Sequence, residues 1–439
     1  MKRLFYTLLF FLPCMLIACG GSDDTPDGDN NPPVVAPPSE EPVDSRLLYN
    51  GIRLPEQWPP VRSSSSELEK GMSPFYLSDK PSVINISVGR QLFVDNFLIE
   101  STNLKRTFYY PEYYSGNPIL TPEQDWEKTG TKGAAFAAPF SDGVWYDEKE
   151  GKYKMWYMAG GGSYATSGAG VTCYAESTDG IHWTKPTLSV VAGTNIVDYN
   201  SERDASVIWL DKQESNASKR YKMFLVARES GKWRYHYKTS PDGKVWRAAV
   251  QSEAIADRST VYKNPFRNVW VYSMRHNVRV DANKLVRARD YNENTDPEAG
   301  TKKAEALLSA FWFGPWANEQ HHTDYPNIAP AIYNQDATPY ESIMLGFFSV
   351  WQGPENDVCA SDNVIKRNQV MVGYSRDGYS WFREDMNPFH AVNTTTSDAW
   401  NQGNLQSVAG APLIVGDKLY FYLSGRRLRG TQEITTTGL

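Results

Sequence analysis

Three aspartates each precede or begin a strand-like segment, and they are far apart in the sequence. They are Asp204 in SERDASVIW (201–209), Asp257 in IADRSTVYKN (255–264) and Asp324 in HHTDYPNIAP (321–330). A group of carboxyls can hydrolyse a glycosidic bond, because one protonates the leaving oxygen and a second acts as base or nucleophile. A third can hold the acid's pKa high through like-charge repulsion. If the fold gathers them, these residues are the first candidates for catalysis.

The same positions also suit a structural role. An Asp in front of a strand is often a turn cap or the partner of an arginine, and Arg203 and Arg258 adjoin two of the three aspartates. Arg258 and Arg275 could instead grip a carboxylate or sulfate bidentately, as an acidic sugar requires. Glu229, like Arg275, follows a strand-like segment and could return to the same place.

Two polar stretches add softer candidates for sugar binding. His321 and His322 precede Asp324, and two consecutive histidines rarely face one metal ion, so we expect sugar hydrogen bonding here and no metal. The stretch WNQGNLQ (400–406) combines an aromatic face with amides, which suits the C–H groups and hydroxyls of a sugar. Its candidates are Trp400, Gln402, Asn404 and Gln406. The alternative for this stretch is a loop packed over the fold.

The sequence segments that would position these residues recur as a repeat. The pattern S-x-D-G-x-x-W occurs as STDGIHW (177–183), SPDGKVW (240–246) and SRDGYSW (375–381), at spacings of 63 and 135 residues. A fixed period of this size indicates a repeat architecture. Asp-Gly favours a tight turn, and the following Trp can fill the hydrophobic layer beneath it. We therefore interpret these aspartates as turn residues without a catalytic role.

Short runs rich in β-forming residues recur at a similar spacing, and each is preceded by a turn and another strand-like run. They are KYKMWYM (152–158), RYKMFLV (220–226), VWVYSMR (269–275), SIMLGFF (342–348) and KLYFYLS (418–424). Hairpins of this kind, written five times, predict an all-β fold, a five-bladed β-propeller. The inner strands of all blades begin near one mouth of a propeller's funnel, where the three aspartates would converge.

The last predicted blade is short of strands, because it begins near residue 406 and the sequence stops at 439. Two strand-like segments before the first blade, 90–100 and 104–114, could complete it, so that both ends of the chain share one sheet. Alternatively, a later strand or domain completes it. The sequence alone leaves both alternatives open.

The N-terminal residues predict export. Residues 1–18 have the basic start and apolar stretch of a signal peptide. Leu-Ile-Ala-Cys resembles a bacterial lipobox, which predicts lipidation of Cys19 and anchoring at the outer membrane or cell surface. The alternative is an ordinary secretory signal. Residues 19–48 are Pro-rich and acidic, which predicts a disordered tether, and 49–439 would form the propeller.

Composition excludes several classes of function. The formal net charge is −6 and no basic run occurs, so nucleic acid is not an expected partner. The sequence has no P-loop, no dinucleotide-binding glycine motif and no G-x-S-x-G elbow. Cys173 and Cys359 are expected to be buried thiols, with no Cys/His cluster for zinc. We expect a carbohydrate partner and no cofactor; the sequence does not indicate an oligomeric state.

The stretch ERDASVIW resembles the R-D-P strand of the invertase-type glycosidases (glycoside hydrolase families 32 and 68) and of family 43. Segments such as QLFVDNFLIE, YESIMLGFF and GDKLYFYLSGR resemble bacterial members of that superfamily that are labelled glycosyl hydrolases, over about residues 90–439. The resemblance implies a five-bladed propeller with two Asp and one Glu in its funnel.

Only Asp204 matches the family pattern, where that position stabilises the transition state. The family's blade-one Asp has no counterpart in AAFAAPF (134–140), and its blade-three Glu corresponds to Asp257. We therefore expect Asp257 as general acid, Asp324 as base or nucleophile and Asp204 as stabiliser.

Two functions of different class follow from these observations. One is a glycoside hydrolase acting on a polysaccharide or oligosaccharide, and the other is a noncatalytic lipoprotein that binds glycan. Carboxylates that form ion pairs with arginines would favour the binding protein. A lyase with a Tyr or His base would need a uronic acid substrate, and no motif favours it.

Overall fold

The computed structural model describes residues 44–439, apart from 129–133, 166–169, 281–283, 307 and 397. The predicted signal peptide, Cys19 and most of the predicted tether lie outside the described residues. Strands dominate the described chain, which confirms the all-β class. Its helices are short: α1 (Ser64–Glu67), α2 (Asp125–Lys128), α3 (Pro297–Lys303) and α4 (Asn356–Asp362). No helix of this part of the chain is long and apolar enough to cross a bilayer.

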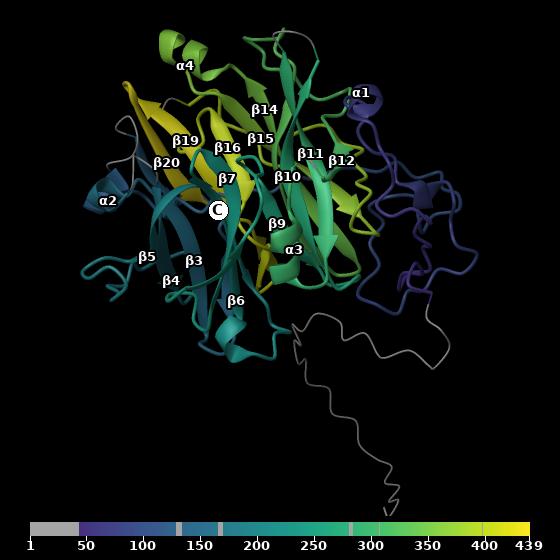
Figure 1. Cartoon of the computed structure of the whole chain (residues 1–439). Coiled ribbons are helices and arrows are strands. Elements are labelled where there is room, and N and C mark those ends of the chain that lie inside the picture. Colours follow the sequence, from purple (N-terminus) through teal and green to yellow (C-terminus); the bar gives the residue numbers. More distant parts are fainter. Residues whose placement is uncertain (1–43, 129–133, 166–169, 281–283, 307, 397) are drawn as a thin grey trace, which may run out of the picture. The chain divides into compact units, whose positions relative to one another are not determined.

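The strands form five consecutive antiparallel groups (Figure 1). The first holds β1 (Ala135–Ala138), β2 (Val144–Asp147), β3 (Lys152–Ala159) and β4 (Gly170–Ser177). The second holds β5 (Ile196–Leu210), β6 (Tyr221–Glu229), β7 (Lys232–Ser240) and β8 (Arg247–Gln251). The third holds β9 (Thr260–Asn264), β10 (Val269–Arg279), β11 (Leu285–Asn294) and β12 (Ala310–Phe313).

The remaining two groups follow in the same order. The fourth holds β13 (Ala331–Tyr340), β14 (Ile343–Gly353) and β15 (Arg367–Ser375). The fifth holds β16 (Asn404–Val408), β19 (Leu423–Arg429) and β20 (Gln432–Gly438), with a small hairpin of β17 (Leu413–Val415) and β18 (Lys418–Tyr420). Four of the five short runs predicted as strands are therefore strands, whereas the fifth, 418–424, is divided between β18 and β19, with irregular backbone at 421–422.

Neighbouring groups adjoin in cyclic order. β5 pairs with β4 through its first half and with β6 through its second half, which joins the first group to the second. β9 contacts both β5 and β13, and β15 pairs with β16. β20 pairs in parallel with β1, so the fifth group returns to the first, and Figure 1 shows yellow β20 beside the blue strands of that group.

The fifth group is completed by a segment that precedes the first group. Leu120 forms an antiparallel bridge with Thr437, and the Ile119 N–H donates to the Thr437 carbonyl at 2.9 Å. Residues 119 and 120 therefore pair with the last strand of the fifth group. The predicted segments 90–100 and 104–114 form no strand and contact the fourth group instead.

The three S-x-D-G-x-x-W turns form as predicted, and each also links two groups. In each turn the Gly N–H donates to the Ser Oγ at 2.8–2.9 Å, and the Asp Oδ1 accepts from backbone N–H groups two and three residues later. Carbonyls of these turns accept hydrogen bonds from the preceding group in cyclic order. The donors are Trp156 to Gly243 (2.6 Å), Tyr422 to Gly180 (2.8 Å) and Trp312 to Tyr379 (2.9 Å).

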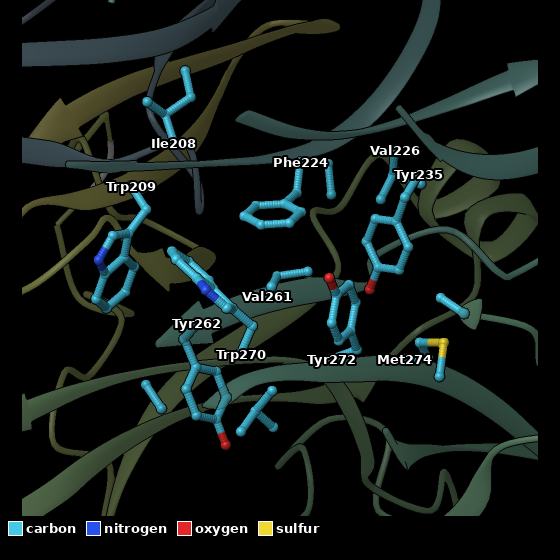
Figure 2. Packing of buried hydrophobic residues seen from close by; sticks show 14 of the residues in the cluster. Ile208, Trp209, Phe224, Val226, Tyr235, Val261, Tyr262, Trp270, Tyr272 and Met274 are labelled. Atoms are coloured by element: carbon cyan, nitrogen blue, oxygen red, sulfur yellow. The ribbon is translucent and has the colours of Figure 1, made fainter. Parts of the chain in front are cut away.

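Aromatic side chains fill the space between groups. Figure 2 shows Trp209 and Phe224 of the second group packed against Trp270 and Tyr272 of the third. The ring centroids of Phe224 and Trp270 lie 5.5 Å apart, and those of Trp209 and Trp270 lie 6.0 Å apart. Because buried aromatic pairs of this kind gain both burial and ring–ring energy, they hold the second and third groups in fixed relative positions.

Candidate functional site

The first strand of three groups is interrupted by a register shift. The shifts fall between Arg203 and Ser206 in β5, between Ile332 and Asn334 in β13, and between Gln406 and Val408 in β16. A bulge re-aims the side chain of the extra residue and often lies next to a site. The residues at these positions are Asp204, Tyr333 and Ser407.

Three residues at corresponding places have left-handed backbone. Phe140, between β1 and β2, has φ 44°, Arg258, just before β9, has φ 54°, and Ser407 has φ 65°. This conformation costs energy for residues other than glycine and clusters at functional sites. Together with the bulges, one irregular residue per group therefore marks the region where the first strands meet.

Arg258 contacts three of the other four residues. Its Nη2 lies 3.0 Å from Asp204 Oδ1, and its own backbone N–H donates to Asp204 Oδ2 at 2.8 Å. Its guanidinium carbon lies 5.5 Å from the centre of the Phe140 ring and 5.6 Å from that of Tyr333. The hydrogen bond from the Arg258 N–H to Asp204 stabilises the left-handed backbone conformation of Arg258. Four groups thus contribute to one cluster.

Asp257 stands beside this cluster and forms an ion pair with Arg275 of β10. Burial raises the pKa of Asp257 and the Asp204 carboxylate raises it further, while Arg275, Arg258 and Arg287 oppose the rise without cancelling it. The side chain is 27% exposed, so it is accessible to a ligand. A carboxyl with a raised pKa keeps its proton to higher pH and can protonate a leaving oxygen.

The structure brings together four of the predicted site residues: Asp204, Asp257, Arg258 and Arg275. Asp324 lies elsewhere, on the loop before β13, with its side chain 75% exposed and its Oδ2 3.9 Å from His322 Nδ1. Its contact is therefore with the loop rather than with the other two aspartates.

The two histidines of the same loop make local contacts. The His321 ring nitrogen Nδ1 lies 2.8 Å from the Pro326 carbonyl oxygen, and the buried His322 ring accepts the Asp324 backbone N–H at 3.0 Å. No cluster of metal-ligating side chains occurs among the residues that the structure describes. Glu229 is exposed at the end of β6, at the turn into β7.

The amide residues before β16 are largely structural. Buried Asn404 donates to the Lys366 carbonyl at 2.9 Å, and Gln402 accepts from the Leu428 N–H at 3.4 Å. Gln406 is 2% exposed, so none of its surface is available to a sugar. Asn404 does connect this stretch to Lys366, which lies near Tyr333.

Trp400 packs inside the fifth group. It is 8% exposed, Tyr113 meets its ring edge-on at 5.7 Å, and Gly425 and Gly438 leave room for its ring only because they lack a Cβ. We expect Trp400→Ala to lower the free energy of unfolding by about 3–5 kcal/mol, as measured by chemical denaturation. Where the variant is folded, its affinity for glycan should equal that of the parent. A stable variant with lost affinity would restore the predicted binding role.

Sequence reasoning missed Tyr333, Phe140, Ser407 and Asp336. Their roles depend on bulges and left-handed residues, which the spacing of apolar residues does not reveal. One signal was present: the polar run Asn334-Gln335-Asp336 interrupts a strand that is otherwise apolar at its start. Asn334 Nδ2 donates to Ser407 Oγ at 3.0 Å and to Asp336 Oδ2 at 3.2 Å, so the run forms a buried polar network beneath the cluster.

Asp336 gives this network a pH dependence. Burial raises its pKa to about 7, against the bonds from Ser141, Val408 and Asn334 that lower it. The folded state then holds a proton between about pH 4 and 7 that the unfolded chain releases, so stability falls as pH rises through this window. Between pH 5 and pH 8 we expect Asp336→Asn to reduce this loss by about 2–3 kcal/mol, since each of the two pH units below 7 contributes about 1.4 kcal/mol. Urea unfolding of both proteins at pH 5 and pH 8 measures it, and equal pH slopes would contradict it.

A cavity of about 500 Å³ lies apart from this cluster, between the N-terminal segment and the fourth group. Trp316, Phe382 and Arg383 are among its lining residues, and no carboxylate is. Arg383 is already held by the buried Glu319 carboxylate at 2.5 Å. This cavity offers no acid–base pair, whereas the Asp204–Asp257 cluster does.

No family model matches this chain, and no curated protein matches it. Solved structures that it resembles include an N-acetylgalactosamine deacetylase from F. plautii, at 12% identity over 73% of this chain and 94% of that one, with a TM-score of 0.43. A glycosyl hydrolase from Bacteroides ovatus is 12% identical over 76% and 92%, with a TM-score of 0.42. A fructofuranosidase variant from Schwanniomyces occidentalis is 11% identical over 72% and 60%, with a TM-score of 0.43. At these values the likenesses assign no activity to this chain.

Proposed function

We propose that this chain is a glycoside hydrolase that acts on a polysaccharide or oligosaccharide. The five groups are the blades of a five-bladed β-propeller, and the Asp204–Asp257 cluster lies in its funnel. The single observation that carries the proposal is Asp257, a partly exposed carboxyl whose pKa burial and Asp204 raise. Asp257 is the general acid, and Asp204 orients Arg258 and stabilises positive charge at the anomeric carbon.

The proposed location is the bacterial outer membrane or cell surface, through lipidation of Cys19. This part of the proposal rests on the sequence of residues 1–19 alone. Metabolic labelling with a palmitate analogue tests it, since Cys19→Ala should remove the label. A labelled Cys19→Ala protein would contradict the anchor.

A noncatalytic glycan-binding protein is the second candidate, and one observation favours it. Both acids of the cluster are paired with arginines, Asp204 with Arg258 and Asp257 with Arg275. Such pairs also occur at purely structural positions. In that case the cluster would bind sugar hydroxyls without proton transfer.

Hydrolysis of a panel of aryl glycosides and plant and algal oligosaccharides, run beside a glycan array, separates the two candidates. Turnover that Asp257→Asn abolishes, with the fold intact by circular dichroism, supports the hydrolase. Binding on the array without turnover of any substrate supports the binding protein.

A further inference from the structure

Tyr333 lies in the cluster, and the proposed acid pair gives it no role. It is the bulge residue of β13, it is half-buried, and it lies near several cations. The guanidinium carbons of Arg258 and Arg287 each lie 5.6 Å from the centre of its ring. The charge of Arg287 also lowers the pKa of Asp257. The same guanidinium therefore acts on the acid and on the Tyr333 ring.

The charges around Tyr333 favour its phenolate. Burial and the Asp204 carboxylate act to raise the pKa of Tyr333, but Arg258, Lys366 and Arg426 outweigh them, and the pKa is lowered. Every other resolved shift among the tyrosines that the structure describes is upward, in most cases because of burial. The cations therefore distinguish this phenol from the others in the chain.

The proposed hydrolysis lacks a nucleophile among the three predicted aspartates. Asp204 is held by Arg258 through two bonds, Asp257 serves as the acid, and Asp324 is 75% exposed on its loop. The cations around Tyr333 offset the negative charge of its phenolate, so an anionic sugar can approach it. Arg287 supports such a substrate, because its own acid partner Glu355 is 4.0 Å away and 58% exposed.

We propose that Tyr333 is the catalytic nucleophile and that the substrate is an anionic glycoside, with a carboxylate or sulfate that Arg287 and Lys366 recognise. This inference rests on the proposed glycoside hydrolase function. The Tyr333 proton is lost to solvent. The phenolate oxygen then bonds to the anomeric carbon while the glycosidic C–O bond breaks, and the Asp257 carboxyl gives its proton to the leaving oxygen.

The second half of the reaction restores the enzyme. The Asp257 carboxylate takes a proton from water, the water oxygen bonds to the anomeric carbon, and the bond from that carbon to Tyr333 breaks. Two displacements at one carbon retain its configuration.

Trapping of the covalent intermediate tests this assignment. The full chain is incubated with 2-deoxy-2-fluoroglycosyl fluorides of a uronic acid, a sulfated hexose and a neutral hexose, and its peptides are analysed by mass spectrometry. We expect an adduct on Tyr333 from the uronic acid or the sulfated sugar and little from the neutral one. Tyr333→Phe should lose the adduct and at least about 10³-fold in kcat, while Tyr340→Phe, at the other end of the same strand, should behave as the parent.

A second measurement needs no turnover. Ultraviolet difference titration of the parent against Tyr333→Phe should show one tyrosine that ionises before all others. Arg287→Met should raise that midpoint and weaken binding of the anionic sugar by about tenfold or more. A Tyr333 that ionises with the remaining tyrosines overturns the inference.

The two proposals fail in different ways. Hydrolysis that requires Asp257 but inverts the anomeric carbon, or that leaves the adduct on another residue, overturns Tyr333 as nucleophile and leaves the hydrolase standing. Preference for neutral glycosides overturns the substrate class. A chain that binds glycan but hydrolyses none of the panel overturns both.

Discussion

An Asp257→Asn variant is expected to lose about 10²- to 10⁴-fold in kcat/KM on oligosaccharides, the range that one general acid contributes. Asn has nearly the same shape but cannot donate the proton that the leaving oxygen needs. Its amide can still approach Arg275, so the fold should be retained and KM should change little. Initial rates with a reducing-sugar assay measure the effect.

The pH dependence of activity and the choice of leaving group also test whether Asp257 is the general acid. The acid must be protonated to act, and its pKa is raised by burial and by Asp204. Activity of the parent should therefore fall as pH rises through that pKa, and this basic limb should be absent from Asp257→Asn. Aryl glycosides with a strongly acidic phenol need no proton, so the variant should lose far less on them.

A matched control is Asp357→Asn, an exposed aspartate at the start of α4 whose carboxylate only caps the Val358 N–H. It should keep parental rates and pH profile. An Asp257→Asn variant that raises KM at unchanged kcat would show that Asp257 only binds substrate. Equal losses on good and poor leaving groups would also remove it as the acid.

The turns and strands were predictable because their signals are local. Each S-x-D-G-x-x-W stretch encodes its own hydrogen bonds, with Ser Oγ and Asp Oδ1 accepting from N–H groups within three residues. Sequence alone did not show that the carbonyl of Gly243 is also the acceptor for Trp156 of another group. That contact needs a distant partner, which no local pattern contains.

The site was only half predictable for the same reason. Asp204 and Asp257 could be found because they precede strands, and the structure joins both to arginines named with them. Tyr333 was missed because a register shift, and not its place in the alternation, turns it toward Arg258. Asp324 was expected at a strand start, but it lies on a loop, seven residues before β13 begins.

The segment 90–114 shows how apolar alternation can mislead. QLFVDNFLIE has the composition of a strand, yet its residues are bends and irregular backbone. Leu92, Val94 and Phe97 pack against the fold without pairing in a sheet. An ion pair holds the segment in place. The guanidinium of Arg376, in the turn after β15, donates three hydrogen bonds of 2.8–3.0 Å to the fully buried Asp95 carboxylate.

Removal of the Asp95 carboxylate is therefore expected to destabilise the chain by about 3–5 kcal/mol, the cost of leaving a buried charge without its partner. Arg376 is 3% exposed, and its guanidinium would keep the Leu92 carbonyl and the Phe97 ring as neighbours but no carboxylate partner from Asp95. Asp95→Ala should show the full loss. Arg376→Met together with Asp95→Leu should recover most of it, because a well-packed apolar pair removes both charges.

The location of the loss shows what the pair does. If Asp95 and Arg376 fasten the N-terminal segment to the fourth group, Asp95→Ala should first expose residues 49–114 to protease at low urea, while the turn at 375–381 stays protected. Loss of the segment would then loosen Tyr114, whose N–H donates to the Leu439 carbonyl at 2.8 Å, and with it the closure of the fifth group. Simultaneous cleavage throughout the chain would instead make the pair part of one cooperative core. A loss below about 1 kcal/mol would mean that water reaches Arg376, and that the packing of Phe97 and Leu92, rather than the ion pair, holds the segment in place.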